Sequence, residues 1–394
     1  MAGAGAAAFP VRRRAERPGV AITQLTSLRY FAAFAVMLSH LDFLGTSSIP
    51  GIRLLYERLF HEGYCGVSFF FVLSGFIITH AYRDELLSGR MSTAGYLARR
   101  AARIFPMHWL VALPFMAWLA IAEHRTLDPA AVTLNLMLLH AWALPGPLHF
   151  SLNGPSWSLS NELFFYAMFP LLILLRPRIL GIGTGVSIVV VTALAVWSAT
   201  VNPRYSSDFE WFFYVNPLVR LIEFAAGILV YETYRAGRYR RRAGTPAEIA
   251  LLVAVPVTMM AFSTLEVPIP LRYQLAYLPL MVVLVFIFAC GRGAVTRRLC
   301  APRLVLLGQA SFSLYLIHRP IFTLVHGLSE RHLGGAVAIP VAAGLLTGCS
   351  AASVLVYRHV EAPMQRFLQR RLRSTFPPKH PATRRLVSPG RPQS

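Results

Sequence analysis

The chain has 394 residues, of which 55% are hydrophobic and only 14% are charged, and its mean hydropathy is +0.53. A soluble chain carries about 25% charged residues, so this composition excludes a soluble globular protein and indicates a multi-pass protein of the cell membrane. The net charge of +21 does not indicate a nucleic-acid partner, because the arginines lie mainly in the tails and between apolar segments, where the positive-inside rule places them.

Residues 1–20 are rich in glycine, alanine and arginine, and we expect them to form a disordered basic tail in the cytosol. No A-x-A cleavage site follows, so we expect the first apolar helix to be retained. The four cysteines lie in or beside apolar segments without CxxC spacing, which predicts neither a disulfide framework nor a metal site.

Apolar segments then follow at about 25–44, 64–82, 104–123, 130–145, 160–176, 179–199, 211–233, 247–264, 273–290, 305–326 and 335–357. A spanning helix needs about 20 residues, and the segment at 130–145 is short. If that segment does not cross, the arginine clusters of all later loops fall on the cytosolic side. We therefore predict an all-α bundle of about ten transmembrane helices over 21–364, with both termini cytosolic, and a disordered basic tail over 365–394.

The first apolar segment carries a cation near its start, Arg29, and a histidine near its end, His40. In a helix the two side chains fall on nearly the same face, about 16 Å apart along the axis. A charge in a membrane helix is costly and marks a functional site unless it reaches the interface. The pair predicts either a catalytic histidine with an in-line cation, or a snorkelling arginine and a packing histidine.

A basic cluster precedes the third segment, where Arg99, Arg100 and Arg103 lie close together. Arg99 and Arg103 are four residues apart and share a helix face. The cluster is either a cytosolic anchor or an anion site for phosphates, which the forked donors of guanidinium groups suit well.

The stretch 150–166 contains Trp157, Ser160 and Glu162. Ser160 would cap the following helix, and Glu162 would then favour the helix dipole in the first turn. A carboxylate that enters a membrane helix also needs a partner. Because His40 lies toward the outer end of its own helix, we expect Glu162 to orient it or to stabilise its charge.

Two later stretches carry further polar side chains. Arg220 and Glu223 are one helical turn apart and predict a mutually neutralised pair. His318 and Arg319 precede a proline within a span, which indicates either a kink or a binding site.

Together these stretches resemble the acyltransferase-3 family of integral membrane O-acyltransferases. The matching segments are Leu25-Thr-Ser-Leu-Arg29 with ten residues before His40, residues 66–75, Arg100-x-x-Arg103, residues 156–162, Arg220-x-x-Glu-Phe-x-x-Gly227, residues 311–318 and Val360-Glu-Ala-Pro363. The resemblance covers about residues 22–365. One departure is Asn161, where the family often has an acid.

The resemblance implies transfer of an acetyl or short acyl group from acyl-CoA, as a co-substrate without a bound cofactor, to a hydroxyl of a glycan or small molecule. It implies His40 and Glu162 as catalytic residues and Arg29, Arg99, Arg100 and Arg103 as acyl-CoA ligands. Trp157, Arg220, Glu223 and His318 are then substrate-binding or structural. The chain resembles the macrolide O-acyltransferases of antibiotic producers more than the modifiers of envelope polysaccharides.

Two other classes remain open. Ten spans with buried histidine, arginine and glutamate also describe a proton-coupled carrier, although the sequence shows no internal repeat of the kind carriers have. A passive assembly or anchoring protein is the third class, and the density of polar residues within the spans disfavours it.

Overall fold

The computed structural model describes residues 22–143, 147–201, 207–237, 243–329 and 337–377, which form helices joined by turns and contain no strand. The helices are α1 (Thr23–Ser39), α2 (Pro50–Leu55), α3 (Gly66–Leu87), α4 (Thr93–Ile121), α5 (Pro129–Leu136), α6 (Trp157–Leu172), α7 (Pro177–Val201), α8 (Ser207–Glu210), α9 (Pro217–Arg235), α10 (Thr245–Thr264), α11 (Ile269–Arg272), α12 (Leu278–Cys290), α13 (Ala294–Leu299), α14 (Pro302–Ser329), α15 (Ala338–Val356) and α16 (Ala362–Thr375). The expected all-α class is confirmed for this part of the chain. The tail expected over 1–20 lies outside it.

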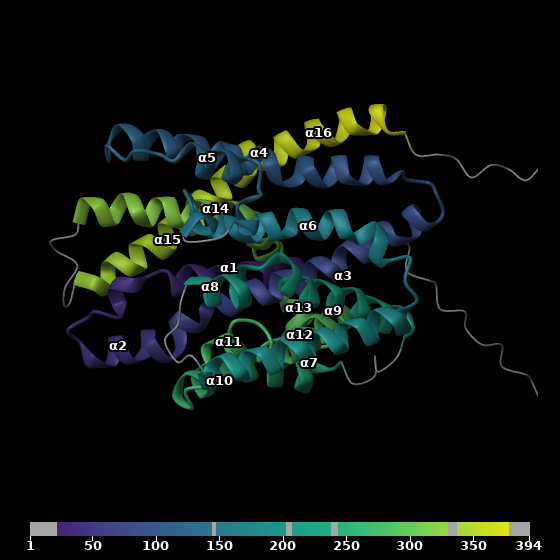
Figure 1. Cartoon of the computed structure of the whole chain (residues 1–394), viewed down its shortest axis with the longest axis horizontal. Coiled ribbons are helices and arrows are strands. Elements are labelled where there is room, and N and C mark those ends of the chain that lie inside the picture. The colour runs from purple at the N-terminus through teal and green to yellow at the C-terminus, as the bar shows by residue number, and fades with distance from the viewer. Residues whose placement is uncertain (1–21, 144–146, 202–206, 238–242, 330–336, 378–394) are drawn as a thin grey trace, which may run out of the picture.

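Within the described ranges, six helical stretches are long and apolar enough to cross a membrane. They are Pro50–Leu87, Thr93–Ile121, Pro177–Val201, Asp208–Arg235, Thr245–Thr264 and Ala338–Thr375. The four other expected spans form α1, α6, α12 and α14, and the first three of these have 17, 16 and 13 residues. The long helices run side by side along the molecule (Figure 1), so a multi-pass membrane bundle is shown, while ten crossings remain a prediction.

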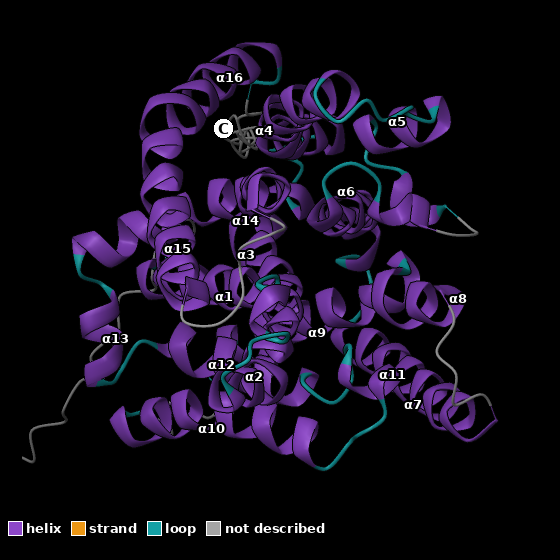
Figure 2. Ribbon diagram, turned by 90° about the vertical axis from the view of Figure 1, so that its left-hand side faces the viewer, coloured by secondary structure: helices purple, strands orange, loops and turns teal. Residues whose placement is uncertain are grey.

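Viewed along the bundle, α1 lies at its centre with α3, α12, α14 and α15 around it (Figure 2). Loops that we expected on the cytosolic side do meet at one end of the bundle. Arg83 at the end of α3 pairs with Glu232 near the end of α9 at 2.9 Å. Ser27 near the start of α1 donates to the Leu299 carbonyl of α13 at 2.6 Å. The side of the membrane that this end faces remains a prediction.

The segment expected at 130–145 forms α5 and a short 3-10 turn, His140–Trp142, rather than a long helix. At 1.5 Å per residue the eight residues of α5 reach about 12 Å, too short for a crossing. Hydrogen bonds fix this segment to the bundle, from Trp211 Nε1 to the Ala141 carbonyl at 2.9 Å and from the buried His108 Nε2 to the Asn135 carbonyl at 2.9 Å. It therefore caps the end of the bundle opposite the arginine-rich loops.

Two sequence expectations about helix ends are corrected. Helix α6 begins at Trp157, so Ser160 lies inside it and accepts from the Ala141 amide instead of capping the helix. The C-terminal segment expected to be disordered from residue 365 is helical to Thr375, because α16 continues from α15 through a π turn and packs against α4. Residues 378–394 lie outside the described part.

Glycines set the closest helix contacts. A Cβ added at Gly75 would collide with the Phe224 carbonyl of α9, and one at Gly227 would collide with the Val72 carbonyl of α3. Helices α3 and α9 are therefore in backbone contact at these two positions. Gly66 likewise faces the Ala32 carbonyl, which lies 2.6 Å from the place a Cβ would take.

We expect Gly75→Val to lower the free energy of unfolding by about 3 kcal/mol, because α3 and α9 must separate to admit the side chain. Gly183→Ala is the matched control, since nothing lies within 4 Å of a Cβ at that position of α7 and alanine favours the helix. The measurement is the thermal unfolding midpoint in detergent. Equal midpoints for the two variants would contradict the close contact of α3 with α9.

Candidate active site

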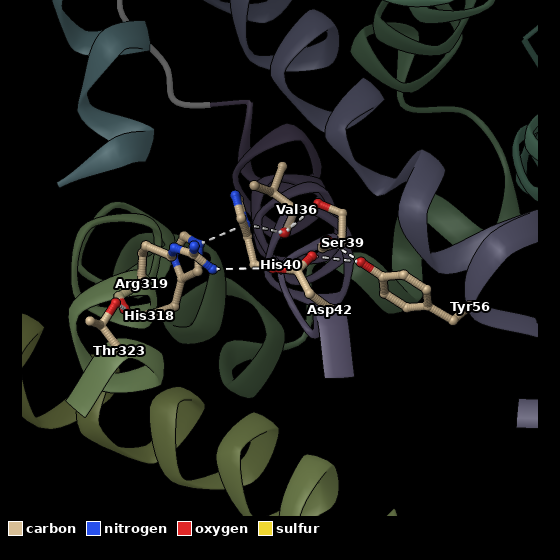
Figure 3. Close-up of polar contacts among 8 residues, drawn as sticks. All are labelled: Val36, Ser39, His40, Asp42, Tyr56, His318, Arg319 and Thr323. Carbon is tan, nitrogen blue, oxygen red and sulfur yellow. Dashed lines mark hydrogen bonds and ion pairs between the residues drawn. The ribbon is translucent and has the colours of Figure 1, made fainter. Parts of the chain in front are cut away.

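His40 lies at the C-terminal end of α1 and faces His318 of α14 (Figure 3). The Nδ1 atom of His40 lies 2.9 Å from the Val36 carbonyl oxygen and 3.2 Å from Nε2 of His318. Nδ1 of His318 lies 3.1 Å from the Leu314 carbonyl oxygen. Two membrane helices thus bring together a pair of histidines that are 278 residues apart in the sequence.

The two carbonyl oxygens determine which ring nitrogens carry protons. A carbonyl only accepts, so Nδ1 of each ring is the donor and each Nε2 is unprotonated in the neutral state. Nδ1–H of His40 then also donates to Nε2 of His318. The remaining nitrogen of His40, Nε2, keeps its lone pair, which is the arrangement that a general base or a nucleophile needs.

Asp42 lies beside this pair but is held by other groups. Tyr56 donates through its hydroxyl to Asp42 Oδ1 at 2.8 Å, and Arg319 Nη1 lies 3.5 Å from Asp42 Oδ2. The same Tyr56 hydroxyl lies 2.9 Å from the Ser39 carbonyl, which ties the end of α1 in place (Figure 3). Helix α14 continues through Pro320, and His318 and Arg319 contact His40 and Asp42 just before that proline.

His40 lines a cavity of about 860 Å³, the histidine cavity, which residues from 125–132 and 148–157 cover. Its polar lining includes Arg319, Glu210, Tyr214 and Asp128, and its apolar lining includes Trp157. A cavity of roughly 300–1,000 Å³ suits a small organic ligand. The histidine cavity is therefore large enough to hold an acceptor next to Nε2 of His40.

A second, smaller cavity of about 140 Å³ lies deeper along α1 and is called here the arginine cavity. Arg29, Arg100, Arg103 and Glu162 are its charged lining residues. Val67 and Tyr315 line both this cavity and the histidine cavity, so they form a shared wall. The bundle thus places three guanidinium groups on one side of that wall and His40 on the other.

The structure corrects the expected contact between Glu162 and His40. Glu162 lines the arginine cavity and accepts from Ser74 Oγ at 3.2 Å, whereas His40 contacts Val36 and His318. The sequence suggested that both lie toward the outer face. Glu162 instead lines the arginine cavity together with Arg29, Arg100 and Arg103, where a carboxylate offsets their charge.

The three arginines of α4 have different surroundings. Arg100 donates to the Tyr166 hydroxyl at 3.2 Å and lies over the Tyr166 ring. Arg103 pairs with the buried Glu361 at 2.7 Å, so its charge is already neutralised. Arg99 does not line the arginine cavity and lies toward α16. Arg29 makes no ion pair or hydrogen bond among the described residues, and its guanidinium is free to bind an anion.

Arg220 and Glu223 form the expected pair, at 3.2 Å with both side chains fully buried. Arg220 also donates to the Tyr273 carbonyl at 2.8 Å and lies over the rings of Phe71 and Trp157. Neither Arg220 nor Glu223 lines the two cavities. Arg220 therefore packs against Trp157 in the wall of the histidine cavity, which fits the structural alternative for the pair.

Sequence reasoning missed Glu361, although it lies in the Val360-Glu-Ala-Pro363 motif. Its buried carboxylate binds Arg103, accepts from Ser313 Oγ at 2.6 Å and accepts from Gln365 Nε2 at 3.0 Å. It joins the C-terminal helix to α4 and α14. Glu361 is the last residue of the π turn. The signal available in the sequence was its carboxylate just after the last apolar segment.

Glu361→Gln is expected to lower the free energy of unfolding by about 3 kcal/mol, because removing one partner leaves the Arg103 charge unpaired in a membrane protein. Glu57→Gln is the control, since Glu57 is exposed. The thermal midpoint in detergent measures both. A Glu361 variant as stable as the Glu57 variant would show that the buried pair adds nothing to stability.

Comparison with known proteins gives a consistent result. Residues 22–358 match a family model described as an acyltransferase domain. The chain is similar to "Acyltransferase MdmB" of Streptomyces mycarofaciens, with 30% identity over 379 residues, 89% of this chain and 94% of that protein. No solved structure matches the chain.

Two more distant relatives have names that refer to the cell envelope. The exopolysaccharide production protein ExoZ of Rhizobium meliloti (strain 1021) is 27% identical over 313 residues, 78% of this chain and 91% of that protein. The putative peptidoglycan O-acetyltransferase YrhL of Bacillus subtilis (strain 168) is 22% identical over 371 residues, 87% of this chain and 55% of that protein.

Proposed function

Since the chain belongs to the acyltransferase-3 family of membrane acyltransferases, we propose that it moves an acetyl or short acyl group from acyl-CoA to a hydroxyl of a macrolide-type or other glycosylated metabolite. The observation that carries the proposal is the position of His40, whose Nε2 is unprotonated and whose side chain lines the larger cavity, with a cationic cavity behind a shared wall. A bacterial plasma membrane is the proposed location.

In the proposed reaction His40 acts on the acceptor from the histidine cavity. Nε2 takes the proton of the acceptor hydroxyl as its oxygen attacks the thioester carbonyl carbon, and the departing CoA thiolate then receives that proton. His318 would stabilise the transient imidazolium by accepting from Nδ1–H of His40. The alternative is a short-lived acyl group on Nε2 of His40, which needs the same unprotonated nitrogen. Glu162 would act indirectly, by balancing the charges of the arginine cavity.

The donor would enter from the arginine-rich end of the bundle. Its diphosphate would bind at the arginine cavity, where Arg29 is unpaired and Arg100 keeps its positive charge toward the cavity. Arg29 and His40 are about 16 Å apart along α1, a span that the extended pantetheine arm can bridge. The thioester would then reach the wall of Val67 and Tyr315, on whose far side His40 lies.

The acceptor assignment rests on the histidine cavity and on the relatives. A cavity of about 860 Å³ with apolar walls and several polar groups suits a bulky, partly glycosylated small molecule. The alternative is O-acetylation of a cell-envelope polysaccharide, which is favoured by the names of the two more distant relatives. The sequence motifs resemble those of the macrolide O-acyltransferases, and we therefore place the metabolite first.

The test is purified protein with radiolabelled acetyl-CoA, with and without a macrolide acceptor. Label on the macrolide would support the proposal. Release of CoA without labelled macrolide would show that the macrolide is not the acceptor and would favour envelope glycans instead. The other class is a proton-coupled carrier, which the buried polar groups also suit. Transport of substrate into liposomes without any consumption of acetyl-CoA would replace the acyltransferase proposal with that one.

A further inference from the structure

A third cavity, with a volume of about 320 Å³, lies at the arginine-rich end of the bundle and is called here the α4–α16 cavity. Its charged lining residues are Glu85, Arg90, Arg99 and Arg373, and Phe376 is its aromatic wall. These residues come from the end of α3, the turn into α4, the first turns of α4 and the end of α16. Neither the proposed diphosphate position nor the acceptor uses this cavity.

The cavity is built by a specific contact rather than by a gap between helices. A Cβ added at Gly95 would lie 3.1 Å from Cβ of Phe376, so the end of α16 packs directly on the first turn of α4. Ser92 caps that turn by accepting from the Gly95 amide at 3.1 Å. Helix α4 therefore begins at the cavity, and its dipole favours an anion there.

Its charge also favours an anion. Three guanidinium groups face one carboxylate, and none of the three arginines forms an ion pair among the described residues. The Nε atom of Arg99 is buried without a hydrogen-bond partner. A buried donor that lacks a partner is costly, and a bound phosphate oxygen would satisfy it. The aromatic face of Phe376 adds a wall on which a planar base can stack.

The α4–α16 cavity lies next to the arginine cavity along one helix. Arg99 lines the former and Arg100 and Arg103 line the latter, so lining residues of the two cavities are one and four positions apart in α4, about 1.5 Å and 6 Å along its axis. A molecule that carries two phosphate groups at a matching separation would place one in each cavity. Coenzyme A has that form, with a 3′-phosphate on its adenosine and a diphosphate beyond it.

We propose that the α4–α16 cavity binds the adenosine 3′-phosphate end of the acyl-CoA donor, through Arg90, Arg99 and Arg373. The inference rests on the proposed function, because it needs acyl-CoA as the donor. It adds a second phosphate site to that function and gives α16, which was expected to be disordered, a role in donor recognition. A phosphate of an anionic lipid headgroup has the same chemistry, and the experiment must distinguish these two sources.

The experiment compares two donors that differ only in the 3′-phosphate: acetyl-CoA and acetyl-3′-dephospho-CoA. Wild-type protein is expected to prefer acetyl-CoA in kcat/KM by about tenfold, the usual effect of hydrogen bonds to a charged group. Arg373→Gln and Arg99→Gln are each expected to lose most of this preference through KM, with kcat retained. Both should use the dephospho donor as well as wild type does.

Arg371→Gln is the matched control, because Arg371 is an exposed arginine of the same helix that lies over Phe367 and lines none of the three cavities. It should keep the preference for acetyl-CoA. If the Arg373 and Arg99 variants also keep it, the proposed phosphate site is wrong even though acyl transfer stands. If wild type releases no CoA from either donor, the proposed function itself fails.

A second experiment distinguishes a lipid phosphate from the donor phosphate. It repeats the assay in phosphatidylcholine nanodiscs with and without phosphatidylglycerol, and measures the thermal midpoint of each protein in the two kinds of nanodisc. The proposal predicts a preference for acetyl-CoA that does not depend on phosphatidylglycerol. Suppose instead that phosphatidylglycerol stabilises wild type, that the Arg373 variant loses this stabilisation, and that the donor preference is unchanged. The cavity would then bind a lipid phosphate, and the assignment to the donor would be overturned.

Discussion

His40→Ala is expected to reduce acyl transfer by about 10³-fold or more while leaving the protein folded, because it removes the nitrogen proposed to take the acceptor proton. The side chain lies at the last turn of α1, and its bonds reach only Val36 and His318. Its loss should therefore have little effect on packing. The measurement is transfer of label from acetyl-CoA to the acceptor, together with the thermal midpoint and the gel-filtration profile in detergent.

His359→Ala is the matched control for this experiment. His359 is an exposed histidine on the π turn between α15 and α16 and lines none of the three cavities. It should transfer label at the wild-type rate. A His40→Ala protein that turned over as fast as this control would remove His40 from the chemistry, and with it the main support for the proposed mechanism.

Arg29→Gln is expected to raise KM for acetyl-CoA by roughly 10- to 100-fold with a smaller change in kcat, because it removes the unpaired guanidinium of the arginine cavity. The side chain lies about 16 Å from His40 along α1, too far to touch the reacting carbonyl at the same time. Its effect should therefore appear in donor binding. Initial rates over a range of acetyl-CoA concentrations separate the two parameters.

A control variant and a second donor test whether Arg29 acts in donor binding. Arg178→Gln, on an exposed part of α7 and remote from the three cavities, should leave both parameters unchanged. Arg29→Gln should also impair acetyl-CoA and acetyl-3′-dephospho-CoA equally, since it is assigned to the diphosphate. A loss confined to kcat, with KM unchanged, would instead place Arg29 in the chemical step and contradict the donor-binding role.

Much of the helical framework could be read from the sequence because it depends on local properties. Apolar runs and the positions of arginines predicted a membrane bundle, and the short segment at 130–145 was recognised as too short for a crossing. The ion pair of Arg220 with Glu223 was predictable because both residues lie on one helix, one turn apart. The motif around Arg29 and His40 likewise indicated the family.

Contacts between helices were not predictable in the same way. Glu162 was expected beside His40, but the packing of the helices places it among the arginines, and the partner of His40 comes from α14. Arg99, Arg100 and Arg103 are close in sequence, yet they point into two different cavities. A residue's depth in the membrane follows from its distance to the helix end, whereas its neighbours depend on how the helix is turned.

Hydropathy, charge and helical spacing act within one segment, so the sequence alone indicated the class of protein and the apolar segments and predicted the residues proposed to carry the chemistry. Only the tertiary structure decided that His318 supports His40, that Glu361 neutralises Arg103 and that α16 closes a cavity over α4. These three contacts join residues far apart in the chain. The packing of whole helices, set by glycine contacts such as that of Gly75 with α9, brings such residues together.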